Sequence, residues 1–277
     1  MGKRKGIIGN GLCHIYLIIL SVIAFFPLLW VLLSSVKSSG ELTSNPTKFL
    51  PEKFTLENFI HVINDLKFVD NIGNSLLIAF SVTIIAIIIS SMAAYGIVRF
   101  FPRIGNVMSK ALVTMYLFPP ILLAIPYSFI MARLGLTNTR IGLVIVYLSF
   151  SVPYAVWMLV GFFKTVPIGI EEAAKVDGAN KVQVFIKVVL PLVVSGIVAT
   201  AIYTFINAWN EFLYALILIN STDLMTVSVK LRSLQGAEIL NWGDMMAAST
   251  LVVVPSVIFF TIIQNKISGG LSEGAVK

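Results

Sequence analysis

The segment 164–191 contains the residue types and spacings best suited to a chemical role, and the role they indicate is binding rather than catalysis. Its acids can form ion pairs, its paired alanines allow a partner to approach closely, and its glycine permits a turn that other residues resist.

The same segment predicts two helices joined by a turn. Pro167 suits a helix start, where its missing N–H leaves no bond unmade, and Glu171 and Lys175 stand at the i,i+4 spacing that stabilises a helix. Gly178 suits the left-handed position after a helix end, and a second helix is expected from Asn180. That helix would carry one apolar face, at spacings i, i+3, i+4 and i+7. The face consists of Val182, Phe185, Ile186 and Val189. Such a hairpin could dock into a partner protein or rest on lipid headgroups, and the pattern alone does not choose between them.

Residues that could support catalysis or bind a metal are scarce elsewhere in the chain. The two histidines, His14 and His61, are far apart in the sequence, and the zinc-binding pattern His-Glu-x-x-His is absent. The single cysteine, Cys13, excludes an internal disulfide framework and a cysteine metal cluster. The phosphate-cradling pattern Gly-x-x-x-x-Gly-Lys-Ser/Thr is also absent. We therefore expect a non-catalytic chain that binds no metal and no nucleotide cofactor itself.

The composition indicates that lipid is the solvent for much of the surface. Of the 277 residues, 57% are hydrophobic and 12% are charged, and the mean hydropathy is +0.93. A soluble domain carries about 25% charged residues, so a buried core alone does not explain the deficit. The net charge of +7 could favour nucleic acid or a membrane surface, and the placement of the charges favours the membrane and no nucleic acid partner.

Six apolar stretches are each long enough to cross a bilayer, which takes about 20 helical residues. None contains Asp, Glu, Lys or Arg, any of which costs about 2.5–3.5 kcal/mol at a helix centre. The stretches are 12–33, 74–98, 111–131, 141–160, 189–207 and 247–265. The first is longer than the apolar region of a cleaved leader, so we expect it to be an anchor. The prediction is an all-α integral membrane protein with one domain, 1–277.

The basic residues predict the orientation. If the N-terminus is inside the cell, most of the 20 Lys and Arg fall in the inner segments, although the outer segments are longer in total. This is the sense of the positive-inside rule. Both termini and the segment 164–191 are therefore expected to be cytoplasmic.

Prolines are expected to break two of the spans. Pro119-Pro120 and Pro126 interrupt the third span, and Pro153 interrupts the fourth. Each proline removes a backbone donor and frees a carbonyl that needs another partner. Broken helices at membrane depth often line a pathway, and a purely structural kink is the alternative. Outside the membrane, a helix is expected to open near Thr55.

Several motifs together resemble one protein family. Glu172-Ala173-Ala174, three residues, Gly178, nine residues and then Val188-Val189-Leu190-Pro191 match the "EAA" loop of permease subunits in binding-protein-dependent ABC importers. The longer run 172–179 is similar to the carbohydrate branch, the maltose-type permeases. Other pieces that agree in order are Asn74-Ser75-Leu76, Ala93-Ala94-Tyr95, Ala208-Trp209-Asn210-Glu211-Phe212, Gly270-Leu271 and Gly274-Ala275-Val276-Lys277. Two departures are Val188, where isoleucine is usual, and Ser195, where a second proline often stands.

The resemblance implies a division of labour among several chains. The loop 164–191 would couple to a separate ATPase: Glu172 would contact that subunit, and Ala173 and Ala174 would give close approach. Asp177 and Gly178 would shape the turn, and Pro191 would fix the link to the fifth span. The implied partners are two ATP-binding subunits that hold ATP and magnesium, a second homologous permease, and an extracellular or periplasmic solute-binding protein. The implied location is the bacterial cytoplasmic (inner) membrane, crossed several times.

Residues that could contact the solute stand at the outer end of the fifth span. An aromatic side chain, amides and an acid suit a sugar, although a tryptophan at this depth can equally serve as an interfacial anchor. These residues are Asn207, Trp209, Asn210 and Glu211. The loop 212–246 would reach toward the solute-binding protein, again by resemblance.

The main alternative is an ion-coupled secondary transporter. Proton relays need ionisable groups inside the bundle, and the six stretches contain only His14. That argues against proton coupling but leaves open a sodium site made of backbone carbonyls. A membrane enzyme or a passive scaffold could also have this composition. An enzyme would need a constellation of residues that the chain lacks, and a scaffold does not account for the hairpin.

Overall fold

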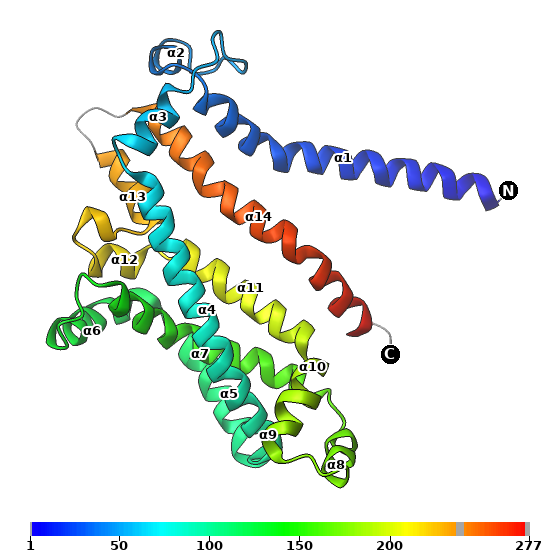
Figure 1. The fold of residues 1–277 in the computed structure, drawn as a ribbon. Helices are drawn as coiled ribbons and strands as arrows, with labels where there is room; N and C mark the ends of the chain where they lie inside the picture. Colours follow the sequence, from blue (N-terminus) through cyan, green and yellow to red (C-terminus); the bar gives the residue numbers. More distant parts are fainter. Residues whose placement is uncertain (1, 237–240, 275–277) are drawn as a thin grey trace. The chain divides into compact units, whose positions relative to one another are not determined.

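The computed structural model describes residues 2–236 and 241–274, and every regular element within those residues is a helix (Figure 1). The long helices are α1 (Gly2–Ser35), α4 (Phe68–Arg99), α5 (Pro102–Tyr116), α6 (Pro120–Arg133), α7 (Arg140–Lys164), α11 (Val194–Asn210) and α14 (Trp242–Gly274). The shorter ones are α2 (Ser39–Ser44), α3 (Glu57–Asn64), α8 (Ile168–Val176), α9 (Lys181–Gln183), α10 (Leu190–Leu192), α12 (Leu213–Leu218) and α13 (Val227–Ser233). Three further turns are the π-helix η1 (Val184–Val189) and the 3₁₀ helices η2 (Thr222–Leu224) and η3 (Leu234–Gly236). Ala275, Val276 and Lys277, the end of the C-terminal motif, lie outside the described residues, as do positions 237–240 of the loop 212–246.

The chain divides into two compact units. Unit 1 comprises Met1–Phe68 and Leu231–Val254, and unit 2 comprises Val69–Lys230 and Pro255–Lys277. The predicted single domain over 1–277 stays a prediction.

Unit 1 is held together by polar side chains that bond to loop backbone. The expected helix after Thr55 is confirmed as α3 (Glu57–Asn64). Its Asn58 amide donates to the carbonyls of Ser35 and Lys37, at 3.0 and 2.7 Å. His61 lies 2.9 Å from a carboxylate oxygen of Asp244 at the start of α14. The bonds from Asn58 satisfy carbonyls that the end of α1 leaves without partners.

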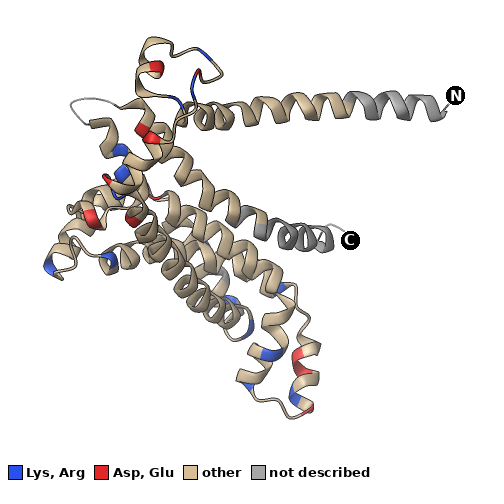
Figure 2. Cartoon of the chain, turned by 45° about the horizontal axis from the view of Figure 1, so that its top comes forward, with Lys and Arg blue, Asp and Glu red and all other residues tan. Residues whose placement is uncertain are grey.

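The predicted segregation of charge holds in the long helices. Figure 2 shows extended stretches without a coloured residue, while blue and red residues gather in the loops and short helices. Judged by length and apolar composition over the described side chains, three helices can cross a membrane: Cys13–Ser35 of α1, α4 and α7. Two bent helix pairs could each supply one more span. The sixth predicted span lies in α14, whose described apolar stretch is Trp242–Ile258. The count of six therefore stays a prediction.

The third predicted span is broken where its proline pair stands. Helices α5 and α6 meet at an angle of 91°, and Pro119 and Pro120 occupy the corner. The predicted break at Pro153 is wrong, because α7 continues from Arg140 to Lys164. Ser90 of α4 donates to the carbonyl of Val152. This bond joins α4 to α7 beside the proline.

The fifth predicted span begins later than expected. The apolar run from 189 is not one straight helix, because the chain bends by 76° between Lys181–Leu192 and α11. Val193 stands at the bend and is buried. Hydropathy alone cannot locate such a bend, because the residues on both sides are apolar.

Close packing of α7 against α11 depends on Gly196. A Cβ atom built on Gly196 would lie 2.2–2.6 Å from three ring carbons of Phe162, closer than a real contact allows. Gly161, the neighbouring residue of α7, has open space around the same position. The helices can therefore approach as they do only because position 196 carries no side chain.

We predict that Gly196→Ala destabilises the protein by about 1–3 kcal/mol, because the added methyl overpacks the ring of Phe162. Gly161→Ala is the matched control and is expected to be neutral or to stabilise by up to about 1 kcal/mol, since alanine favours a helix interior. Thermal unfolding of the detergent-solubilised protein measures both. Equal melting temperatures for the two variants would contradict the packing argument, and Phe162→Leu is expected to restore the stability of Gly196→Ala.

Candidate functional site: a surface hairpin and an aromatic cavity

The predicted hairpin is present, and its turn is built by Gly178. This residue has a φ of +90°, a conformation that glycine adopts without steric cost. The N–H of Gly178 donates to the carbonyl of Lys175, and that of Ala179 donates to Ala174. These two bonds form a Schellman motif and satisfy the last carbonyls of α8. Helix α8 begins directly after Pro167, as the sequence predicted.

The second arm starts with a capping box. The Asn180 side chain accepts from the N–H of Gln183, and the Gln183 side chain accepts from the N–H of Asn180, both at 2.9 Å. Two orphan donors are thereby satisfied by neighbours in sequence. Residues close in sequence therefore build both the turn and the start of the second helix. That helix begins after Asn180, where the sequence predicted it.

The predicted single apolar face of the second arm is wrong. The arm continues as the π-helix η1, in which Val184 and Val189 are fully buried while Val182 and Ile186 are exposed. A π-helix advances more than 3.6 residues per turn, so residues five apart share a face there. Val184 and Val189 belong to a buried cluster with α4 and α7 that includes Tyr95, Leu159 and Phe163.

The first arm is anchored by Glu171 rather than by Glu172. The Glu171 side chain is 2% exposed and forms an ion pair with Arg99 at the end of α4. Its other oxygen accepts a hydrogen bond from Tyr95 at 2.8 Å. Arg99 also donates to the carbonyl of Val166, at 2.6 Å, just before α8. The predicted i,i+4 pairing of Glu171 with Lys175 is therefore wrong, because this carboxylate points into the protein.

The opposite side of the hairpin faces outward. Glu172, Ala173 and Asp177 are exposed, whereas Ala174 is half-buried. Val176 is 87% exposed. An apolar side chain with that exposure contributes no hydrophobic burial to the stability of this chain. The other exposed apolar side chains of the hairpin are Ile168, Ile170, Val182 and Ile186. Pro191 is exposed in α10, two residues before the bend at Val193.

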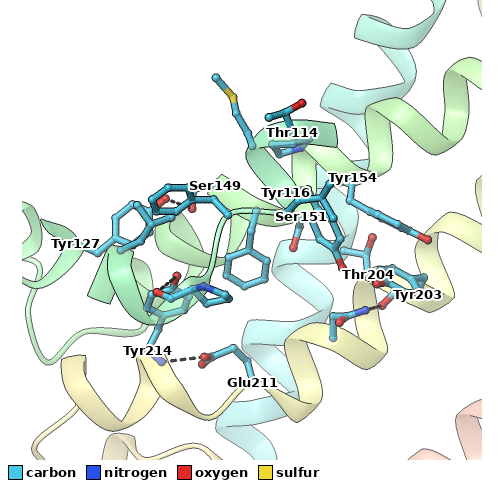
Figure 3. Close-up of a pocket in the computed structure, with 18 of the residues that line it drawn as sticks. Thr114, Tyr116, Tyr127, Ser149, Ser151, Tyr154, Tyr203, Thr204, Glu211 and Tyr214 are labelled. Carbon is cyan, nitrogen blue, oxygen red and sulfur yellow. Dashed lines mark hydrogen bonds between the residues drawn. The ribbon is translucent and has the colours of Figure 1, made fainter. Parts of the chain in front are cut away.

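A cavity of about 880 Å³ lies within unit 2, between α5, α6, α7, α11 and the start of α12 (Figure 3). Aromatic rings and neutral polar groups dominate its wall. The lining residues are Thr114, Met115, Tyr116, Leu117, Phe118, Pro120, Leu123, Tyr127, Ser149, Phe150, Ser151, Pro153, Tyr154, Tyr203, Thr204, Asn207, Asn210, Glu211 and Tyr214. The break at Pro119-Pro120 contributes directly, since residues on both sides of it line the cavity.

Three of the four residues expected to contact a solute line this cavity. Asn207, Asn210 and Glu211 are part of its wall. Trp209 is buried instead, with its ring stacked on Phe205 at 6.2 Å between centroids. On helix α11, residues 207 and 210 share a face while 209 points elsewhere, and Glu211 follows directly after the helix. Contact with a solute stays a prediction for all four.

Glu211 is held in place by protein donors. It accepts from the Tyr147 hydroxyl and from the N–H groups of Tyr214, at 2.8 Å, and Ala215, at 3.1 Å. The carboxylate thus caps the first turn of α12, just after α11 ends. Burial raises the pKa of the Glu211 carboxyl, and the hydrogen bonds that it accepts oppose the rise.

Helix α4 braces the loop that follows the cavity. Asn74 donates to the carbonyls of Asp223 and Met225 and accepts from Arg140 at 2.9 Å. Ser75 accepts from the N–H of Val227 at 2.8 Å. The motif Asn74-Ser75-Leu76 therefore contributes two side chains that fix residues 223–227.

Sequence reasoning missed the tyrosines of the cavity and the pairing of Arg99 with Glu171. The motif Ala93-Ala94-Tyr95 was a usable signal, since its tyrosine stands four residues before Arg99 on one helix face. No comparable signal marked the tyrosines, which come from five separate helices. Within the described residues, no three His, Cys, Asp or Glu side chains are grouped where they could hold a metal ion.

Comparison with known proteins gives concordant matches. Residues 86–272 match the family described as binding-protein-dependent transport system inner membrane component. The chain is 34% identical over 258 residues to the inner membrane ABC transporter permease protein YcjP of Escherichia coli (strain K12), covering 92% of each chain. It is 32% identical over 267 residues to the diacetylchitobiose uptake system permease protein NgcG of Streptomyces coelicolor (strain ATCC BAA-471 / A3(2) / M145), covering 95% of this chain and 88% of the relative.

A solved structure shares the fold. The crystal structure of a bacterial ABC transporter involved in the import of the acidic polysaccharide alginate contains a chain that superimposes with a TM-score of 0.80 at 20% identity. The match covers 95% of this chain and 97% of that one. The hairpin at 164–191, the helical architecture and the extent of these matches lead to one conclusion. This chain belongs to the family of inner membrane components of binding-protein-dependent transport systems.

Proposed function

We propose that this chain is the transmembrane permease subunit of an ATP-driven importer of a sugar or related solute, and that it forms half of the translocation pathway. Family membership supports transport, and the Streptomyces coelicolor relative is named for the uptake of diacetylchitobiose. The similarity of residues 172–179 to the carbohydrate branch also supports a sugar as the solute. The pathway would include the aromatic cavity.

The observation that carries the proposal is the two-sided hairpin. Its inner side is rooted in the protein through Glu171, Val184 and Val189. Its outer side presents Glu172, Ala173 and exposed aliphatic side chains to a partner. An exposed apolar patch rimmed by charge is typical of a protein interaction site. The rim of this patch carries both signs of charge, with Glu172 and Asp177 beside Lys175 and Lys181. The resemblance of the loop to the EAA loop favours an ATPase over lipid as its partner.

The hairpin would pass movement from the ATPase to the membrane helices. A displaced α8 carries Glu171 with it, and the ion pair to Arg99 and the hydrogen bond to Tyr95 join that carboxylate to α4. Rigid elements linked by buried polar contacts transmit displacement in discrete steps. The bend at Val193 then connects the second arm of the hairpin to α11, which lines the cavity.

The remaining components would be separate chains. Two ATP-binding subunits would hold ATP and magnesium, so this chain would bind no cofactor and perform no catalysis. A second homologous permease would supply the other half of the pathway. An extracellular or periplasmic solute-binding protein would deliver the solute, and the loop 212–246 would reach toward it.

We further propose six spans with both termini in the cytoplasm, in a bacterial inner membrane. The two bent pairs and α14 would complete the count begun by α1, α4 and α7. The hairpin then lies on the side of the cell where ATP is available. An ion-coupled secondary transporter would have no use for this hairpin.

Charge reversal on the outer side of the hairpin is expected to stop uptake. Glu172→Lys changes an exposed residue, so the protein should still insert and fold, but its contact with the ATPase should be lost. ATP-driven uptake by the assembled complex in proteoliposomes measures this. Glu52→Lys is the control, because Glu52 is also exposed and its pair with Lys48 lies at the solvent surface, where ion pairs contribute little to stability. Normal uptake by Glu172→Lys would argue strongly against docking at this site.

Replacing the turn glycine is expected to have the same effect through the backbone. Gly178→Asp forces a side chain into a φ of +90°, a strain of about 1–3 kcal/mol, and should displace α8. Gly40→Asp introduces the same side chain on the short helix α2, outside the hairpin, where nothing lies within 4 Å of the new Cβ and the backbone is ordinary. Uptake should be lost in the first variant and retained in the second. Equal uptake by both would refute the role of the turn.

Loss of the buried carboxylate is expected to destabilise the hairpin. Glu171→Gln leaves Arg99 buried without its counter-charge, at a cost of about 3–5 kcal/mol. Glu172→Gln is the matched control and should change stability by less than about 0.5 kcal/mol, because that side chain is exposed. Thermal unfolding of the single variants, of Arg99→Gln and of the double variant gives the coupling energy. A coupling energy near zero would show that the pair does not anchor α8.

A further inference from the structure

The cavity in unit 2 has two aromatic groups on opposite sides. Figure 3 shows Tyr127 and Tyr214 at one end and Tyr116, Tyr154 and Tyr203 at the other. The Tyr154 and Tyr203 rings stack with centroids 4.0 Å apart, and the hydroxyls of Tyr116 and Tyr203 are joined by a 2.6 Å hydrogen bond. The rings are therefore held by one another and present pre-ordered flat surfaces.

The second group is ordered in the same manner. Tyr214 stacks on Phe150 at 5.8 Å and meets Tyr127 edge to face at 5.5 Å. The Tyr127 hydroxyl donates to Ser149 at 2.7 Å, and the Tyr214 hydroxyl donates to the carbonyl of Pro120 at 3.0 Å. Tyrosine offers a ring face for apolar contact and a hydroxyl for hydrogen bonding.

Neutral hydrogen-bonding groups fill the space between the two aromatic groups. Ser151, Thr204, Asn207 and Asn210 line it. Asn207 donates to the Tyr203 carbonyl at 2.8 Å, and this bond leaves the amide oxygen as an acceptor for a ligand. The Asn210 side chain is exposed, so its amide can turn toward a ligand. A site with several such groups suits a ligand rich in hydroxyls.

The charge of this wall favours a neutral ligand over an anion. None of the lining residues is Lys, Arg or His, and the single carboxylic acid is Glu211. The N–H groups that open α12 are already bonded to that carboxylate. An anionic ligand would therefore find no cationic side chain in this wall to offset the cost of leaving water.

We propose that this cavity binds a neutral oligosaccharide directly, with a sugar ring stacked on Tyr154, which is only half-buried, and with sugar hydroxyls bonded to Asn207 and Asn210. The inference deepens the proposed function and rests on it. Sugar rings have apolar C–H faces, which pack on aromatic rings, and a polar rim, which needs donors and acceptors. The volume of about 880 Å³ falls within the range of about 300–1,000 Å³ that is typical of small-molecule sites.

Cysteine protection tests the proposal, because Cys13 is the only cysteine in the sequence. In a Cys13→Ser background, Asn207→Cys places a thiol in the cavity wall and Thr165→Cys places one on an exposed turn as a control. The assembled importer, without ATP, is treated with a thiol-reactive methanethiosulfonate reagent. The probes are a pool of neutral di- to tetrasaccharides (maltose, trehalose and chitobiose series) and a pool of oligogalacturonates of the same lengths.

The neutral pool should slow modification of Asn207→Cys by about tenfold at about ten times its Kd, and should leave Thr165→Cys unaffected. Oligogalacturonates should protect neither thiol. Adding Tyr154→Ala should raise the protecting concentration about tenfold, through the lost ring contact, while Tyr154→Phe should restore it. Tyr16→Ala, at an exposed tyrosine of α1, should have no effect.

Equal protection by the oligogalacturonates would overturn the proposal, as would an absence of protection by either pool. ATP-driven uptake of the same neutral pool by the same proteoliposomes separates the two levels of inference. Uptake without protection would contradict direct binding in this cavity and leave the proposed function intact. Protection without ATP-dependent uptake would contradict the proposed function but would still support sugar binding in this cavity.

Discussion

The arrangement of the hairpin depends on a carboxylate that is buried at its base. A buried charge costs several kcal/mol unless it is paired and fully hydrogen-bonded, and Glu171 meets both conditions through Arg99 and Tyr95. Arg99 in turn bonds the carbonyl of Val166, in the link between α7 and α8. One side chain of α4 thereby fixes both the start of the hairpin and its first helix. The outer surface of α8 is available for a partner because its inner surface is held in this way.

Helix α7 connects the hairpin to the cavity. Its C-terminal part contributes Leu159 and Phe163 to the buried cluster that holds Val184 and Val189. Its middle part contributes Phe150 and Tyr154 to the cavity wall. Because Pro153 does not break the helix, both regions move with one rigid element. The same helix can therefore link events at the hairpin to the shape of the cavity.

Breaks in the apolar segments create the space that the cavity occupies. The chain turns by 91° at Pro119-Pro120, and residues before and after that corner face the same volume. The Tyr214 hydroxyl donates to the carbonyl of Pro120 at this corner and so ties α12 to the start of α6.

The sequence by itself determined what depends on neighbours along the chain and on solubility in lipid. The turn at Gly178, the helix start after Pro167, the break at Pro119-Pro120 and the charge-free helices all follow from local backbone chemistry and transfer free energy. Tertiary structure decided which way each side chain faces. A regular 3.6-residue period could not anticipate the π-helix that buries Val184, and no spacing rule pairs Glu171 with Arg99, 72 positions away. The cavity likewise brings together tyrosines from helices that only the fold makes adjacent, because burial and pairing are properties of the packed chain and not of its order.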